Sequence, residues 1–229
     1  MKYALVNNKK THIKDVERGT MGLDCWLSTC VVKACKGHYM EYWKYDGEKP
    51  ELPEGYENET EWHNAWKDSL KDDYVEVICG DNNEHRADIK TPDYVIEIQN
   101  SPISFDAAKE RSFFYSKLNK DTRMVWVVNA YAACSKRNIK TEPKENKLLV
   151  HWKYKKKWAV DISELKSTHV YLDLSPKSDK MLRIWKHDGL IYGKWETKKI
   201  FYDKFLAAYS EESYECFIKK FEALNAADY

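Results

Sequence analysis

Two acidic residues, Asp88 and Glu97, lie in a stretch of the chain that reads as a β-hairpin, residues 84–101. Pro92 and Asp93 suit the centre of a two-residue turn, because proline presets φ at the second turn position. A turn there pairs Asp88 with Glu97 on one face of the hairpin, with their Cβ atoms about 4.5–5.5 Å apart. Two carboxylates this close favour a divalent cation between them. Mg²⁺ commonly uses one or two carboxylates together with water and phosphate oxygens, which indicates phosphodiester chemistry.

The hairpin also has a plainer interpretation. Residues 84–90 alternate between a polar and an apolar face, and residues 94–99 alternate as well. A surface hairpin often carries acidic residues on its solvated face, where Arg86 or Lys90 could neutralise them without a metal. Both interpretations are open from this stretch alone, and the elements around the hairpin have to decide between them.

A helix is predicted before the hairpin, over residues 58–71, with Asn58 and Glu61 as a capping box. His63 and Lys67 lie one turn apart on the same face of this helix, so they could act together. The alternative is an amphipathic helix that packs through its tryptophans and leaves these two side chains in solvent.

A second helix is predicted after the hairpin, over about residues 105–118, with Ser101 and Ser104 as candidate N-caps. Arg111 and Tyr115 lie on one stripe of this helix. Arg111 could reach the hairpin, or it could be solvated or ion-paired, and surface ion pairs of that kind contribute little.

The middle of the chain therefore runs helix, strand, strand, strand, helix, strand, with the two carboxylates on the second and third strands. The last strand, residues 124–128, is an unbroken apolar run and is expected at the centre of a sheet covered on both faces. This order predicts a mixed α/β (α+β) fold. We expect an N-terminal β and cysteine-containing segment (1–56), a core (57–135), and C-terminal strands and helices that complete the domain (136–229).

Length and composition narrow the class of protein. The chain has 229 residues, enough for one domain with additions, and 43% hydrophobic residues, ample for a packed core. The 38 basic and 37 acidic residues nearly cancel, so any nucleic-acid-binding surface has to be local. No signal peptide and no membrane-spanning apolar run are evident, so we expect a cytoplasmic protein.

Four potential zinc ligands follow one another near the N-terminus: Cys25, Cys30, Cys35 and His38. Only Cys35 and His38 have a separation common in structural zinc sites. Cysteine is also a small apolar residue that is often buried. A structural Zn²⁺ is one interpretation, and reduced thiols without metal, favoured by the wide spacing, are the other.

Basic and aromatic residues are interleaved in residues 148–160, which include Trp152, Tyr154, Trp158 and three consecutive lysines, 155–157. Lysines that follow a nucleic-acid backbone, with aromatic rings that stack on unpaired bases, would produce this pattern. A lysine-protected edge strand is the alternative, and the pattern is typical of it. Further strands are predicted over residues 169–200, with turns at Pro176 and Asp188-Gly189, and the end of the chain is predicted to be helical.

Several of these segments resemble a known family. The segment ADIKTPDYVIEIQNSPIS, followed by Arg111 and Tyr115 in AKERSFFY, is similar to the competence-protein CoiA-like family of the PD-(D/E)XK nuclease superfamily. The upstream EWHNAWK, with His63 and Lys67, resembles the helix that precedes the nuclease core in that family. VYLDLSPKSDKMLRIWK resembles its C-terminal strands, so that the resemblance covers most of residues 1–210.

The resemblance implies a metal-dependent nuclease, an endonuclease or exonuclease, with a restriction-endonuclease-like core. Asp88 and Glu97 would hold Mg²⁺ or Mn²⁺, which polarises the scissile phosphate and lowers the pKa of a bound water. Gln99 stands where such cores usually have lysine, and its amide would orient the water by hydrogen bonding. Lys67 or His63 would then stabilise negative charge or transfer a proton.

The resemblance also implies a substrate-binding set of Ser101, Arg111 and Tyr115. Arg111 would clamp a phosphate with two hydrogen bonds, and Tyr115 would position Arg111 or stack on the substrate. DNA is favoured over RNA as the partner, in DNA uptake, processing or defence, and a homodimer is compatible with the sequence. A non-catalytic nucleic-acid-binding or scaffold protein and an RNase with the same site are the open alternatives.

Overall fold

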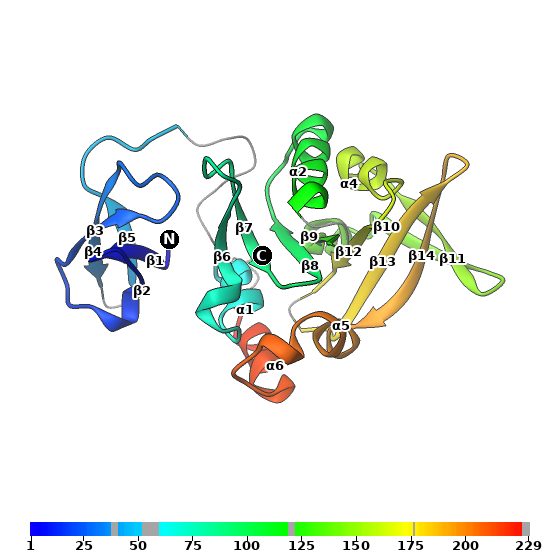
Figure 1. The fold of residues 1–229 in the computed structure, drawn as a ribbon. Coiled ribbons are helices and arrows are strands. Elements are labelled where there is room, and N and C mark those ends of the chain that lie inside the picture. The colour runs from blue at the N-terminus through cyan, green and yellow to red at the C-terminus, as the bar shows by residue number, and fades with distance from the viewer. Residues whose placement is uncertain (38–40, 52–59, 119–121, 176, 226–229) are drawn as a thin grey trace. The chain divides into compact units, whose positions relative to one another are not determined.

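A computed structural model describes residues 1–37, 41–51, 60–118, 122–175 and 177–225. The chain divides into two compact units, one of residues 1–58 and 78–86 and the other of residues 59–77 and 87–229. The described residues form two β-sheets and six α-helices, which confirms the predicted mixed α/β class (Figure 1). In these residues no helix has the length and apolar character needed to cross a membrane.

Five antiparallel strands form the sheet of the first unit, in the order β2–β1–β3–β4–β5. They are β1 (Tyr3–Val6), β2 (Lys9–His12), β3 (Met21–Asp24), β4 (Val31–Lys36) and β5 (Glu41–Tyr45), with a short 3-10 helix at Ile13–Asp15. Apolar side chains alternate along these strands, and Ala4, Val32, Ala34 and Trp43 pack with Ile13 into a small core. The β structure predicted for the N-terminal segment is confirmed.

A nine-stranded sheet, most of it in the second unit, has the order β10–β11–β14–β13–β12–β9–β8–β7–β6. Its strands are β6 (Val75–Cys79), β7 (His85–Lys90), β8 (Tyr94–Gln99), β9 (Arg123–Asn129), β10 (Ile139–Lys144), β11 (Lys147–Trp152), β12 (Thr168–Asp173), β13 (Lys180–His187) and β14 (Leu190–Thr197). β8, β9 and β12 run parallel to one another at its centre. β9 has neighbours on both sides and its residues 124–128 are buried, which confirms the predicted central strand.

Helices cover this sheet in two layers. The helices are α1 (Glu61–Lys67), α2 (Phe105–Leu118), α3 (Tyr131–Ser135), α4 (Lys157–Ile162), α5 (Lys198–Phe205) and α6 (Tyr214–Glu222), with 3-10 turns at Asp72–Tyr74 and Ala207–Tyr209. α2 and α4 lie side by side on one face (Figure 1). On that face the indole of Trp126 in β9 donates to Ser112 Oγ of α2 at 3.2 Å and packs on Trp158 of α4.

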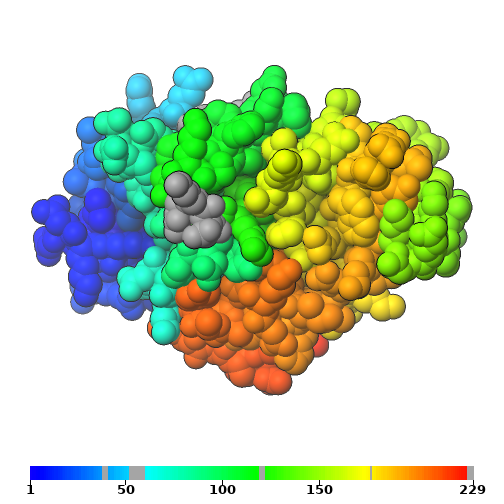
Figure 2. All heavy atoms as spheres, turned by 45° about the vertical axis from the view of Figure 1, so that its right-hand side comes forward, coloured from blue at the N-terminus to red at the C-terminus, as the bar shows by residue number. Residues whose placement is uncertain are grey.

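α1, α5 and α6 form the other layer. The indole of Trp66 in α1 contacts the rings of Phe201 in α5 and of Phe217 and Phe221 in α6, and Phe201 also contacts Tyr171 of β12. In the space-filling view the orange and red C-terminal segment closes this side of the second unit (Figure 2). The predicted C-terminal helices are therefore confirmed, and their aromatic stripes pack on α1 and the sheet.

A buried ion pair joins this layer to the sheet. Lys198, at the start of α5, lies 2.9 Å from the carboxylate of Asp173 at the end of β12, and both side chains are fully buried. Lys198 Nζ also donates to the carbonyl oxygens of Ser175 and Ser178, and the Trp62 indole of α1 donates to Asp173. Because both charges are buried and three further hydrogen bonds reach them, the pair holds α1, α5 and β12 in one arrangement.

The helix predicted over residues 58–71 is shorter and begins differently. α1 follows Thr60, whose hydroxyl accepts from the backbone N–H of His63, while the His63 ring accepts from the Thr60 N–H, both at 3.4 Å. The predicted capping box of Asn58 and Glu61 is therefore wrong: a threonine hydroxyl caps as well, and an imidazole three residues later replaces the glutamate. Asn58 lies outside the described residues.

Two predictions for the C-terminal third have different outcomes. β11 pairs with both β10 and β14, so the alternative in which it is an edge strand is wrong. The turn at Asp188-Gly189 is confirmed, since both residues have the positive φ of a tight hairpin turn, 49° and 74°. Pro176 lies outside the described residues.

Candidate active site around Asp88 and Glu97

The hairpin forms in the predicted register. β7 and β8 pair antiparallel with Lys90 opposite Val95, and the backbone N–H of Thr91 donates to the carbonyl oxygen of Tyr94 at 2.8 Å across the turn. The pairing extends to Ile89 opposite Ile96, and the same register continued by one residue would set Asp88 opposite Glu97. The predicted pairing of Lys90 with Val95 is therefore confirmed, and the pairing of Asp88 with Glu97 stays a prediction.

The Asp88 carboxylate is half-buried and reaches across to the partner strand. Its Oδ2 accepts from the backbone N–H of Ile98 at 2.8 Å. A carboxylate that accepts from the main chain of the neighbouring strand is held in one orientation. This hydrogen bond holds the Asp88 carboxylate close to Glu97, the residue that precedes Ile98 in β8.

Glu97 is buried, with 2% of its surface exposed, so it does not belong to a solvated hairpin face. Its Oε2 lies 3.3 Å from Arg111 Nη1, whereas its Oε1, also buried, accepts no hydrogen bond within the part of the chain that the structure describes. The pKa of Glu97 is raised to about 8, by burial first and by the nearby Asp88 carboxylate second, against the opposing effects of the Arg111 charge and of the Tyr115 hydroxyl, which lies near the carboxyl without a hydrogen bond of normal geometry. The plain interpretation of a surface glutamate is wrong.

Arg111 and Tyr115 reach the site from α2, which forms as predicted after the N-cap Ser104, whose hydroxyl accepts from the N–H of Ala107. Arg111 is 2% exposed and Tyr115 is fully buried. Glu97 pairs in register with Trp126, which packs on α2, so its side chain points into this layer. The helical spacing of these residues, combined with the parallel β8–β9 pair, brings them together with Glu97.

Gln99 and Ser101 form a small network at the end of β8. The Gln99 side-chain amide donates to Ser101 Oγ at 2.8 Å and to the Ser101 carbonyl at 3.3 Å, and both residues are buried. Between them, the carbonyl oxygen of Asn100 accepts from Lys156 Nζ at 2.8 Å. The amide nitrogen of Gln99 is thus directed toward Ser101, and a lysine from a distant segment lies beside the same strand end.

His63 and Lys67 lie in the layer of α1, α5 and α6. His63 is 9% exposed, and its ring takes part in the cap at the start of α1. Lys67, 1% exposed, forms an ion pair of 3.3 Å with Glu76 of β6. The structure brings Asp88, Glu97 and Arg111 together by direct contacts and charge, while a catalytic role for His63 and Lys67 stays a prediction.

Glu76 is a residue that the sequence reasoning missed. It is buried and adopts a φ of 47°, a left-handed conformation that is unusual for a residue other than glycine inside a strand. Such a conformation costs on the order of 1–3 kcal/mol and persists only where the surroundings enforce it, here through the buried pair with Lys67. The available signal was a single acidic residue within the apolar run Val75–Cys79.

The side chains of the site offer few ligands for a metal ion. Within the described ranges, no three His, Cys, Asp or Glu side chains come together as a possible metal site. Asp88 and Glu97 supply two carboxylates, the number from which Mg²⁺ is commonly held when water and phosphate complete its shell. The buried Glu97 Oε1 without a hydrogen bond fits a cation, so these residues are compatible with a divalent ion.

The N-terminal cysteines are reduced and half-buried at positions 25, 30 and 35. His38, the fourth ligand of the predicted zinc site, lies outside the described residues, so that a zinc ion at this place stays a prediction.

Comparison of the chain with models of protein families, with curated proteins and with solved structures yields no match. The functional conclusion therefore rests on the chemistry of the site itself.

Proposed function

We propose that the chain is a divalent-metal-dependent nuclease that hydrolyses phosphodiester bonds of DNA. One observation carries the proposal: the buried Glu97 carboxyl has one oxygen without a hydrogen bond of normal geometry in the described structure and lies close enough to the Asp88 carboxylate for the two charges to interact. Two carboxylates in this position repel each other, and a divalent cation removes the repulsion while satisfying the buried oxygen.

The arrangement of elements supports a core of the PD-(D/E)XK type. α1, β6, β7, β8, α2 and β9 follow in the order that the CoiA-like resemblance implies, with the carboxylates on the second and third of these strands. α2 packs on the face to which Glu97 points, and α1 belongs to the opposite layer.

Asp88 and Glu97 would hold Mg²⁺ or Mn²⁺, which supplies Lewis-acid polarisation of a phosphate and a more acidic bound water. Asp88 is oriented by the Ile98 N–H, and Glu97 by Arg111. Arg111 is almost fully buried, so we propose that it positions Glu97. It would then not make the direct phosphate contact that was predicted from the sequence.

Gln99 and Ser101 would organise the substrate side of the site through their mutual hydrogen bond. Gln99 carries no charge, so stabilisation of negative charge on the substrate has to come from another cation. A role for Lys67 stays a prediction, because α1 belongs to the layer opposite to the face toward which Glu97 points and Lys67 is paired with Glu76.

A non-catalytic nucleic-acid-binding protein is the second candidate. The observation that favours it is the Arg111–Glu97 ion pair, because a guanidinium already neutralises one oxygen of the carboxyl without any metal. The two candidates differ in whether the Asp88 and Glu97 carboxylates are needed for cleavage or only for the fold.

The test is cleavage of single-stranded, double-stranded and branched DNA and of RNA, with Mg²⁺, Mn²⁺ or EDTA. Wild-type protein is compared with Asp88→Asn, Glu97→Gln and the control Asp106→Asn, which changes an exposed carboxylate of α2. We expect metal-dependent cleavage in the wild type and the control, and a loss of roughly 100-fold or more in the two site variants with their folding intact. Full activity of Glu97→Gln would refute the site assignment.

A further inference from the structure

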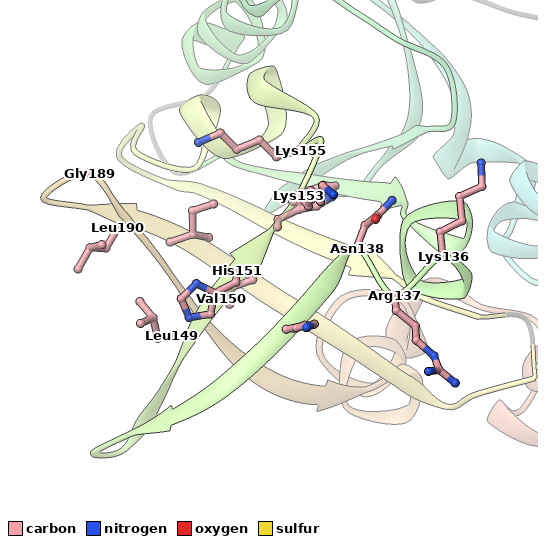
Figure 3. Close-up of a pocket in the computed structure, with 13 residues that line it drawn as sticks. Lys136, Arg137, Asn138, Leu149, Val150, His151, Lys153, Lys155, Gly189 and Leu190 are labelled. Atoms are coloured by element: carbon pink, nitrogen blue, oxygen red, sulfur yellow. The ribbon is translucent and has the colours of Figure 1, made fainter.

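A groove with a strongly basic lining lies on the far strands of the large sheet. It has a volume of about 670 Å³, within the range of ligand-binding clefts, and is formed by the start of β10, the end of β11 and the turn before β14 (Figure 3). Five cations line it: Lys136, Arg137, Lys140, Lys153 and Lys155. Among the described residues, no acidic side chain belongs to the lining.

These cations are available for a ligand. All five are exposed, and across the described residues none of them forms an ion pair. His151, another residue of the lining, lies 3.4 Å from the carboxylate of Glu142, which is largely in solvent. A chain with a net charge of only +1 therefore concentrates unneutralised positive charge at one place.

The groove is held together by the main chain. Lys140 stands opposite His151 in the β10–β11 pair, and Lys153 follows His151 by two residues. The side chains of these three residues therefore share one face. The backbone N–H of Lys153 donates to the carbonyl oxygen of Asn138 at 2.8 Å and fastens the two segments. The spacing of the charges thus follows from strand geometry.

An exposed aromatic ring stands beside the groove. Tyr154 is 79% exposed, and Lys153 Nζ lies 4.9 Å from its ring centroid. Its φ of 55° is left-handed, a conformation that a tyrosine rarely adopts and that presents the ring to solvent between Lys153 and Lys155. A solvent-facing ring among lysines can stack on an unpaired base, and such stacking is not available from a base inside a duplex.

The same loop reaches the candidate active site. Lys156, two residues after Tyr154, donates to the carbonyl oxygen of Asn100, the residue directly after Gln99. We propose that this basic groove, together with Tyr154, is a docking surface for single-stranded nucleic acid. This proposal rests on the proposed nuclease function: the bound strand would run from the far edge of the sheet toward Asp88 and Glu97. The phosphates would lie along the groove cations and an unpaired base on Tyr154.

Binding is measured without cleavage. The probe is a fluorescein-labelled oligothymidine of about 15 nucleotides, and a labelled DNA hairpin serves as the duplex, both in EDTA and in the Glu97→Gln background. Fluorescence anisotropy at several salt concentrations gives Kd and its salt dependence.

Charge reversal tests the groove. The double variant Lys140→Glu, Lys153→Glu should weaken oligothymidine binding at least about 10-fold. It should also reduce the slope of log Kd against log salt by about 1.4, because each lost phosphate contact on a single strand accounts for roughly 0.7 of that slope. Lys44→Glu with Lys180→Glu is the matched control, because it changes the net charge equally at two exposed lysines outside the groove. Equal Kd values for the two double variants would overturn the proposal.

Tyr154 tests the preference for single strands. Tyr154→Ala should weaken oligothymidine binding roughly 5- to 50-fold with little change for the hairpin, and Tyr154→Phe should retain most of the affinity because it keeps the stacking surface. An equal loss on both probes, or no loss on either, would contradict a stacking role.

The two proposals can fail separately. Weaker binding by the groove variant in a protein that never cleaves would support the groove and refute the nuclease. Unchanged binding and cleavage by the groove variant, in a wild-type protein that does cleave, would refute the groove alone.

Discussion

Replacing Glu97 with glutamine should stabilise the metal-free protein at neutral and alkaline pH. Glu97 is buried, and its pKa rises to about 8 through burial first and the Asp88 carboxylate second, with Arg111 opposing both. The folded protein therefore prefers the protonated carboxyl, whereas the unfolded chain ionises it at its ordinary value of 4.5. Glutamine resembles the protonated side chain and cannot ionise.

The magnitude follows from proton linkage. Because the pKa is raised in the folded state, the stability associated with the protonated group is complete below about pH 4.5 and is lost as the pH rises toward 8. Between these values the loss is about 1.4 kcal/mol per pH unit, so that the free energy of unfolding falls by roughly 2–3 kcal/mol between pH 5 and pH 7 from this group alone. Above the folded pKa the loss levels off.

Urea unfolding in EDTA from about pH 5 to pH 8 measures this contribution as the difference between wild type and Glu97→Gln. The difference should grow with pH in favour of the variant. Glu110→Gln, at an exposed position of α2, is the control for the chemical change alone. Mg²⁺ should then stabilise the wild type at pH 8 and leave Glu97→Gln unaffected. A difference that stays constant with pH would show that Glu97 ionises normally, and the electrostatic argument for the site would fail.

Two further predictions concern the fold that holds the site. Thr60→Ala should lower the free energy of unfolding by about 0.5–2 kcal/mol, because the His63 N–H loses its cap, and Thr60→Ser should not; urea titration compares the two. Lys198→Ala should cost about 3–5 kcal/mol, since Asp173 is left buried without its cation, whereas Lys199→Ala, next to it but on the surface, should cost less than about 1 kcal/mol. Similar unfolding midpoints for the two lysine variants would contradict this account.

Local patterns predicted much of the second unit. The apolar run 124–128 became a central strand, the stripe of Arg111 and Tyr115 became the buried face of α2, and Pro92-Asp93 set the hairpin register. Each rests on side chains a few residues apart, where periodicity and turn chemistry act directly.

Other features could not be read from the chain because they depend on which residues meet across the fold. The predicted cap at Asn58 competed with an equally good one at Thr60. Nothing local indicates that Lys67 would pair with Glu76, or that residue 76 would take a left-handed conformation.

The sequence by itself determined the turn at Pro92-Asp93 and the pairing of Lys90 with Val95, because strand alternation and a proline turn leave few registers. Only the tertiary structure decided that Glu97 is buried beside Arg111 and that its pKa rises, since burial depends on the α2 layer covering β8. It likewise decided that lysines from two separated segments, 136–140 and 153–155, line one groove. Charge and solvent exposure are properties of the packed molecule, and local periodicity does not contain them.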